Sequence, residues 1–262
     1  MTGSVLKILL PLAVAIAAFA TWEIAVRAFA IPVYVLPPPS AIWTALVTDQ
    51  ASLFHSLWIT LRVTLEAFAL ALVSGFLIAV LFSRNRLIEL TFAPYAVALQ
   101  ATPVVAIAPL ISIWVGEAHP ELALLILAWI VAVFPVLTSA TVGLRSADPN
   151  LVDLFRLHGA GPLQRLWRLE LPSALPQILS GMKVSGSLAL IGAVVAEFAA
   201  GSGAATGLAW RIIESGNRLQ IPRMFAALAL LCALGIAIYL LLSLLEHRCL
   251  RQWHASAKAR EG

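Results

Sequence analysis

Residues 121–143 read ELALLILAWIVAVFPVLTSATVG, and after Glu121 the run contains no charged side chain. A helix needs about 20 mostly apolar residues to cross the hydrocarbon core of a bilayer. The backbone must be helical there, because lipid offers no hydrogen-bond partner to an open strand. This run therefore predicts a transmembrane helix, and it suggests the fold class of the chain around it.

Outward from this run, further segments of similar length share its apolar character. The predicted spans cover residues 5–29, 60–82, 91–115, 121–143, 178–199 and 224–245. Proline and glycine occur inside several of them, among them Pro103, Gly186 and Gly192. Membrane helices tolerate such residues, and small ones let neighbouring helices approach closely. We therefore predict an all-α, polytopic membrane protein in which residues 1–262 form one domain with six transmembrane helices.

The composition supports this class and argues against others. Hydrophobic residues make up 61% of the chain and charged residues only 11%, with a mean hydropathy of +0.95. A soluble domain of this size needs a charged surface to stay dispersed, so lipid is the expected surrounding. The net charge of +4 is spread among apolar runs, which argues against a nucleic-acid partner. The two cysteines and five scattered histidines have no metal-ligand spacing, so we expect no metal site.

Positive charge predicts how the spans are oriented. If successive loops alternate sides, the N-terminus, the 82–91 turn, the 144–177 segment and the C-terminal tail share one side. That side holds twelve of the Lys and Arg residues, against five on the other. Cytoplasmic loops carry the excess of Lys and Arg. We therefore predict that both termini are cytoplasmic and that the 116–121 turn, which has neither residue type, faces outward.

Two connections are too long to be simple turns. In residues 30–58, Ser40 follows a run of three prolines and is expected to cap a short helix at the outer interface. The other connection is residues 144–177, LRSADPNLVDLFRLHGAGPLQRLWRLELPSALPQ. Here Asp148-Pro149 is expected to start a short amphipathic helix, since Asp is a good cap and Pro suits the first turn.

Glycine is expected to end this helix at Gly159, and a second short helix follows from about Leu163. Pro172 and Pro176 are expected to break the second helix. An amphipathic element of this kind either lies flat on lipid or inserts into a groove on a partner. Composition alone leaves both open.

Residues in this segment resemble the cytoplasmic signature of permeases of ATP-binding-cassette importers. That signature runs E-A-A, three residues, G, a gap, then L-P. Asp153, Leu154 and Phe155 stand at the first three positions, Gly159 at the glycine, and Leu171-Pro172 at the closing pair. Asp replaces Glu here, and the larger Leu-Phe pair would require a roomier partner groove.

The resemblance extends over nearly the whole chain. Leu36–Ser40, the pattern from Pro103 to Leu110 with Trp114 and Gly116 after it, and Val195-Ala196-Glu197-Phe198 are similar to one branch of these permeases. That branch handles nitrate, sulfonates and taurine, and includes permeases for thiamine-pyrimidine precursors and riboflavin. The resemblance implies a multi-pass protein of the bacterial inner membrane that imports a sulfonate-, taurine- or nitrate-like anion or a vitamin precursor.

The resemblance also implies partners and coupling residues. A coupling helix would dock into a groove of a separate ATPase and relay its closure to the spans by alternating access. The implied coupling residues are Asp153, Leu154, Phe155, Arg156, Leu157, His158, Gly159, Leu171 and Pro172. The chain has no Gly-x-x-x-x-Gly-Lys-Ser/Thr loop, so ATP would be bound by the ATPase, and we expect no cofactor or catalytic residue in this chain. A second permease copy in a homodimer, a periplasmic binding protein and membrane lipid complete the expected partners.

Polar residues inside the spans are candidates for the transport pathway, because burying them in lipid is costly. Gln100 and Thr102 lie midway through the third predicted span, beside Pro103, and Glu197 lies near the outer end of the fifth. Glu197 is a gate partner, a helix-to-helix link or an interfacial charge. The otherwise neutral spans suit a solute released into a cavity.

Two other functions remain as alternatives. A membrane scaffold or assembly protein without transport would share the composition. An integral-membrane enzyme acting on lipid would need a catalytic cluster, and Asp148, Asp153, His158 and Glu170 have neither triad nor metal-ligand spacing.

Overall fold

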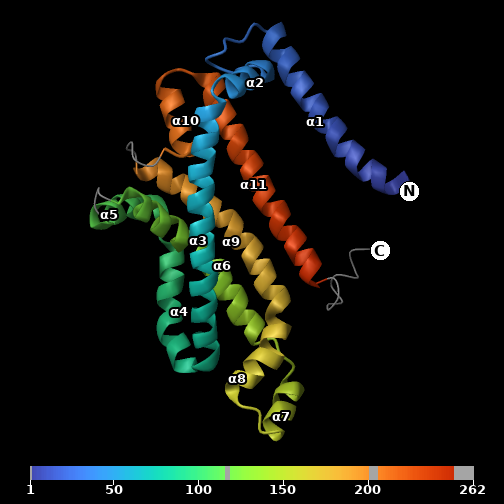
Figure 1. The fold of residues 1–262 in the computed structure, drawn as a ribbon, viewed down its shortest axis with the longest axis vertical. Coiled ribbons are helices and arrows are strands. Elements are labelled where there is room, and N and C mark those ends of the chain that lie inside the picture. Colours follow the sequence, from blue (N-terminus) through green and yellow to red (C-terminus); the bar gives the residue numbers. More distant parts are fainter. Residues whose placement is uncertain (1, 116–118, 201–205, 251–262) are drawn as a thin grey trace. The chain divides into compact units, whose positions relative to one another are not determined.

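All regular elements in the computed structural model, which describes residues 2–115, 119–200 and 206–250, are helices (Figure 1). Five helices are long and apolar enough to span a membrane. They are α1 (Thr2–Ala28), α3 (Gln50–Arg84), α6 (Pro120–Leu144), α9 (Leu171–Ala200) and α11 (Ile221–Leu250). The bent pair α4 (Arg86–Ala101) and α5 (Val104–Val115) makes a sixth candidate if it counts as one span. The predicted all-α, polytopic class is confirmed.

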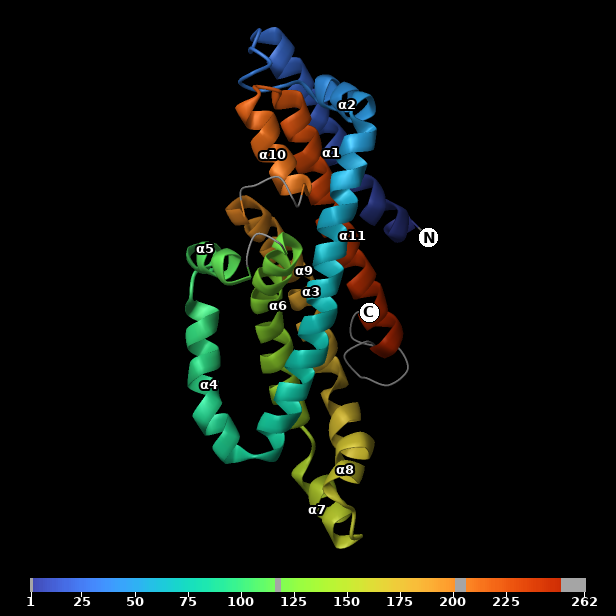
Figure 2. The same cartoon turned by 60° about the vertical axis from the view of Figure 1, so that its left-hand side comes forward.

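The third predicted span, 91–115, is not one helix. The chain bends between α4 and α5, as Figure 2 shows, and the angle of this bend is 101°. Thr102 has extended backbone angles (φ −74°, ψ 126°). Pro103 accounts for this, because a proline disfavours helical geometry in the residue before it and offers no N–H to the helix. The sequence predicted one span that tolerates Pro103, whereas the structure has a turn between two helices at this position.

Shorter elements fill the connections. They are α2 (Pro39–Thr48), α7 (Pro149–Leu157), α8 (Pro162–Arg165), the π-helical turn η1 (Leu166–Glu170) and α10 (Leu208–Asn217). The helix predicted from about Leu163 continues from α8 through η1 into α9 (Leu171–Ala200), so Pro172 and Pro176 do not break it as predicted. Pro172 lies in the first turn of α9, where a proline is tolerated. The wider π-helical turn η1 directly precedes it. Most of the predicted outer turn, residues 116–118, lies outside the described residues.

The chain divides into two compact units, one of residues 1–58 with 206–232 and one of residues 59–205 with 233–262. In the first unit, Glu23 of α1 accepts hydrogen bonds from the backbone N–H and the hydroxyl of Ser40. Ser40 is thus not the N-cap of α2: Pro38 holds that position, and Ser40 joins α2 to α1. Trp22 of α1 packs against Phe225 of α11 at 6.1 Å between ring centroids.

Helix α6 forms the core of the second unit, with buried residues along its whole length. It packs along α9 through small residues: Gly181 and Gly192 lie against the opposite helix with no room for a side chain, and Gly143 lies almost as close to it. Ser185 of α9 donates a hydrogen bond of 2.7 Å to the Ala132 carbonyl of α6. Without a hydrophobic drive between helices in lipid, close backbone approach and such bonds hold the pair together.

Candidate coupling segment and transport pathway

Helix α7 is closed at both ends by hydrogen bonds. The Asp148 side chain accepts from the N–H of Asn150 at 2.8 Å, and Pro149 occupies the first turn. At the other end Gly159 has a φ of +71°. The Gly159 N–H donates to the Arg156 carbonyl, and the Ala160 N–H donates to the Phe155 carbonyl. These two bonds form a Schellman motif, so the start and end that the sequence predicted for this helix are confirmed.

The side chains of α7 are largely uncovered in this chain. Leu154 is 47% exposed and Leu157 85% exposed, whereas Phe155 is half-buried. Asp153 and Arg156 form an exposed ion pair at 3.3 Å, and the His158 ring lies 2.9 Å from the Leu154 carbonyl. In Figure 1 α7 and α8 extend past the ends of α4 and α6 within their unit. A nine-residue helix with exposed leucines is a surface that can bind a partner.

The remaining predicted coupling residues lie at the start of α9, where Leu171 is half-buried and Pro172 exposed. The second short helix, predicted from about Leu163, begins as α8 and continues as the π-helical turn η1. Trp167 is 61% exposed, while Leu166, Leu169 and Glu170 are buried. The π-helical geometry of η1 rotates this face relative to a regular α-helix.

Glu170 is held by two arginines from different elements. Its carboxylate accepts from Arg84, at the end of α3, at 2.6 Å, and from Arg165 of α8 at 2.6 Å. We call these three residues the Glu170 cluster. The Glu170 side chain is 9% exposed, so its two arginine partners compensate for the loss of hydration around it. Sequence reasoning considered Glu170 as a catalytic candidate and did not find its partners. The signal that could have found them is an acid beside the apolar residues Leu166 and Leu169.

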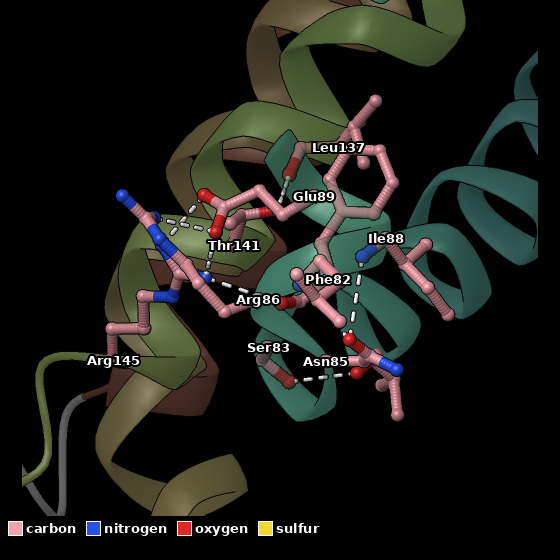
Figure 3. Close-up of polar contacts among 11 residues, drawn as sticks. Phe82, Ser83, Asn85, Arg86, Ile88, Glu89, Leu137, Thr141 and Arg145 are labelled. Carbon is pink, nitrogen blue, oxygen red and sulfur yellow. Dashed lines mark hydrogen bonds and ion pairs between the residues drawn. The ribbon is translucent and has the colours of Figure 1, made fainter. Parts of the chain in front are cut away.

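A second cluster joins α4 to the end of α6 (Figure 3). Arg145, directly after α6, donates to both carboxylate oxygens of Glu89 at 2.7 and 2.5 Å and to the Phe82 carbonyl at 3.1 Å. Arg86 donates to the same carboxylate at 2.6 Å. We call Glu89, Arg86 and Arg145 the Glu89 cluster. Asn85 caps α4 beside it by accepting from the N–H of Leu87 at 2.9 Å. Sequence reasoning missed this cluster.

Two cavities lie next to each other between α4 and α6. The first, of about 260 Å³, runs from the Glu89 cluster to Gln100. The second is about 230 Å³. Gln100 and Phe134 line both, so the predicted pathway residue Gln100 lies where the cavities meet. The Thr102 hydroxyl donates to the Ala98 carbonyl of α4. Thr102 and Pro103 lie at the bend between α4 and α5.

Glu197 is buried in the second unit, away from both cavity linings. The Thr60 hydroxyl of α3 donates to its carboxylate at 2.7 Å, and both residues are at most 2% exposed. Of the three roles open for Glu197, the geometry supports a link between helices α3 and α9.

Replacing Thr60 by valine tests this link. Thr60→Val keeps the shape but removes the donor to a buried carboxyl group, and leaving a buried acceptor unsatisfied costs about 1–3 kcal/mol. We expect the apparent unfolding temperature in detergent to fall by several degrees. The control is Thr64→Val, whose equally buried hydroxyl donates to the Thr60 carbonyl on the same helix. An equal shift in both variants would contradict the link.

Polar residues of α10 and of the segments near it in the first unit pair among themselves. Arg211 of α10 donates to Glu214 at 2.7 Å and to the Ser56 hydroxyl at 2.9 Å. The hydrogen bond from Arg211 holds the pKa of Glu214 below its usual range. Arg223 lies 3.3 Å from Asp49 and donates to Ser52. These contacts pair Arg211 with Glu214 and Arg223 with Asp49 inside the unit.

Comparison with known proteins defines the class. Residues 71–251 match the family of binding-protein-dependent transport system inner membrane components. The chain is 34% identical to a probable ABC transporter permease protein of Haemophilus influenzae, over 93% of this chain and 97% of that one. The fold matches an inward-facing structure of the methionine ABC transporter MetNI with a TM-score of 0.67 at 20% identity, over 77% of this chain and 97% of that one.

The chain therefore belongs to the binding-protein-dependent permease family: it is the permease subunit of an ABC importer and a multi-pass membrane protein. Among its relatives, the riboflavin transport system permease protein of Chloroflexus aurantiacus is 34% identical, over 90% of this chain and 86% of that one. The formylaminopyrimidine transport permease protein of Halalkalibacterium halodurans is 33% identical, over 86% and 88%. The taurine permease of Escherichia coli is 28% identical, over 90% and 86%. These relatives agree with the branch that the sequence motifs indicated.

Proposed function

We propose that this permease imports a small, flat heterocycle of the vitamin or vitamin-precursor type, driven by an ATPase that docks on α7. The observation that carries the coupling role is the capped helix α7 with its exposed leucines. The ATPase can transmit its closure only through a stiff element, and a short helix whose ends are both capped is stiff.

The docking energy comes from the apolar face of α7. Burying a leucine side chain contributes about 1.5–3 kcal/mol, so Leu154 and Leu157 together supply a useful part of an interface. Asp153, Arg156 and His158 surround them with polar groups, Gly159 ends the helix, and Leu171 and Pro172 are assigned to the rim of the contact. Two ATPase subunits, a second copy of this chain in a homodimer and a periplasmic binding protein complete the assembly, with both termini cytoplasmic.

The solute path in this proposal follows the two cavities along α4. Gln100 contacts the solute with its amide, and the bend at Thr102 and Pro103 lets α4 and α5 move separately during alternating access. Glu197 acts as a helix link. ATP is bound by the partner, and this chain needs no cofactor.

The choice of solute class rests on charge and on similarity. The first cavity is walled by Phe82 and Phe134, and its cation, Arg145, is already neutralised by Glu89. A sulfonate would have to compete for that arginine, whereas a neutral ring stacks on aromatic walls and accepts from an amide. The riboflavin and formylaminopyrimidine permeases are also more similar to this chain than the taurine permease.

Transport in proteoliposomes tests the proposal. The chain is purified with its native neighbours, and ATP-dependent uptake of riboflavin, an aminopyrimidine and taurine is compared. We expect uptake of a heterocycle and its reduction by about tenfold in Gln100→Leu, since one hydrogen bond contributes about 1 kcal/mol or slightly more. Gln50→Leu, at an exposed position, is the control.

The outcomes separate the parts of the proposal. Uptake of taurine alone would overturn the solute class and leave the importer in place. Purification without an ATPase would overturn the coupling role of α7.

A further inference from the structure

The turn between α3 and α4, residues 82–89, is tied to both ends of the segment that carries α7. That segment leaves α6 at Arg145 and joins α9 after Glu170. The Glu89 cluster holds the first end, and the Glu170 cluster holds the second. Both sets of bonds come from one short stretch, which contributes Arg84, Arg86 and Glu89.

This arrangement adds to the helices that are mechanically connected to α7. By chain connection alone, the segment between Arg145 and Glu170 is attached only to α6 and α9. Arg84 adds the end of α3, and Glu89 adds the start of α4. Helix α4 carries Gln100 and leads to the bend before α5. The two clusters therefore extend the mechanical connection from the coupling segment to the helix that lines the cavities.

Burial and geometry make these connections firm. The Glu170 side chain is 9% exposed and the Glu89 side chain 14%. Arg145 binds Glu89 with two nitrogens on two oxygens, which fixes orientation as well as distance. Separating the partners of such a pair leaves a poorly solvated charge. Each cluster is therefore expected to move as one body and to keep its ion pairs.

We infer that the Glu89 and Glu170 clusters transmit the movement of α7 to α4, so that Glu89, Arg145, Glu170 and Arg84 are positioning residues for coupled transport. This inference rests on the proposed docking of an ATPase at α7. Glu89 and Arg145 also line the first cavity, so a shift of α4 relative to α6 changes that cavity directly.

The test measures solute taken up per ATP hydrolysed in proteoliposomes of the whole complex. In Glu89→Gln and Glu170→Gln we expect ATPase binding and hydrolysis to stay within about twofold of the wild type, while uptake per ATP falls at least fivefold. The charge exchange Glu89→Arg with Arg145→Glu rebuilds the pair and should restore at least half of the coupling.

A matched control separates transmission from simple stability. Lys183 of α9 and Glu246 of α11 form another largely buried ion pair, at 2.7 Å, with side chains 18% and 15% exposed. Glu246→Gln removes that pair away from the 82–89 turn, so it should leave uptake per ATP unchanged. If Glu170→Gln does not accumulate in the membrane, Arg84→Gln, which removes one partner of the same cluster and whose side chain is 23% exposed, takes its place in the test.

Three results would overturn the inference: unchanged uptake per ATP in the cluster variants, an equal loss in Glu246→Gln, or no recovery in the charge exchange. Failure of the wild-type chain to bind an ATPase is a different outcome, because it overturns the proposed docking itself.

Discussion

Gly181→Val will prevent the tight packing of α6 on α9. A Cβ atom at Gly181 would lie 2.5 Å from the Ser139 Cβ and 2.9 Å from the Pro135 carbonyl oxygen. Side-chain rotation cannot relieve this contact, because the obstacles are a Cβ and a backbone atom. The two helices must separate, and the Ser185 to Ala132 hydrogen bond lengthens with them. Overpacking costs about 1–3 kcal/mol in ordinary cores and more when backbone must move.

The expected result is a fall of at least about 5 °C in the apparent unfolding temperature in detergent, with less folded protein in the membrane. Gly181→Ala should fall between the wild type and the valine variant. Gly235→Val of α11 is the control, because its nearest obstacle is the flexible end of Leu190 at 3.3 Å. A valine at position 181 that left the unfolding temperature unchanged would contradict the close α6–α9 approach.

Gly159→Val will uncouple ATP hydrolysis from uptake while the protein still inserts. A Cβ at this position meets nothing within 4 Å, so the substitution causes no clash. The penalty comes from the φ of +71°, since left-handed backbone costs an L-residue about 1–2 kcal/mol and a β-branched residue more. A valine at position 159 avoids this conformational energy only if the end of α7 unwinds, which breaks the two hydrogen bonds that close the helix.

Uptake and ATP hydrolysis measured together check this prediction. We expect uptake to fall about tenfold or more while hydrolysis continues, since 1.4 kcal/mol corresponds to a factor of ten in the population of the folded cap. Gly159→Asn should behave almost as the wild type, because asparagine tolerates left-handed geometry. Gly161→Val is the second control, as Gly161 is extended (φ −65°) and equally unobstructed. Equal losses in both valine variants would argue against a specific role for the α7 cap.

The family and the structure favour transport over the alternatives. The acids and histidine that a lipid-modifying enzyme would need are engaged elsewhere. Asp148 caps α7, Asp153 pairs with Arg156, His158 lies against its own helix, and Glu170 is held by two arginines. The relatives are transporter subunits, and no finding favours a scaffold.

Local patterns in the sequence were sufficient for the fold class and for α7. Apolar runs of about 20 residues predict spans because lipid cannot satisfy an open backbone, whatever the tertiary arrangement. Asp148-Pro149 and Gly159 define the ends of α7 because caps act over two to four residues. The spacing around Gly159 was also enough to indicate the permease family.

Only the tertiary structure determined the angles and the side-chain contacts between those elements. Pro103 indicates an interruption, yet the 101° angle depends on how α5 packs against α6 and α9. Glu89 and Arg145 are 56 residues apart, Arg84 and Glu170 are 86 apart, and Thr60 and Glu197 are 137 apart. Such pairs form because helix packing brings distant residues within about 3 Å of each other. The periodicity of one segment does not determine which distant polar residue becomes its partner.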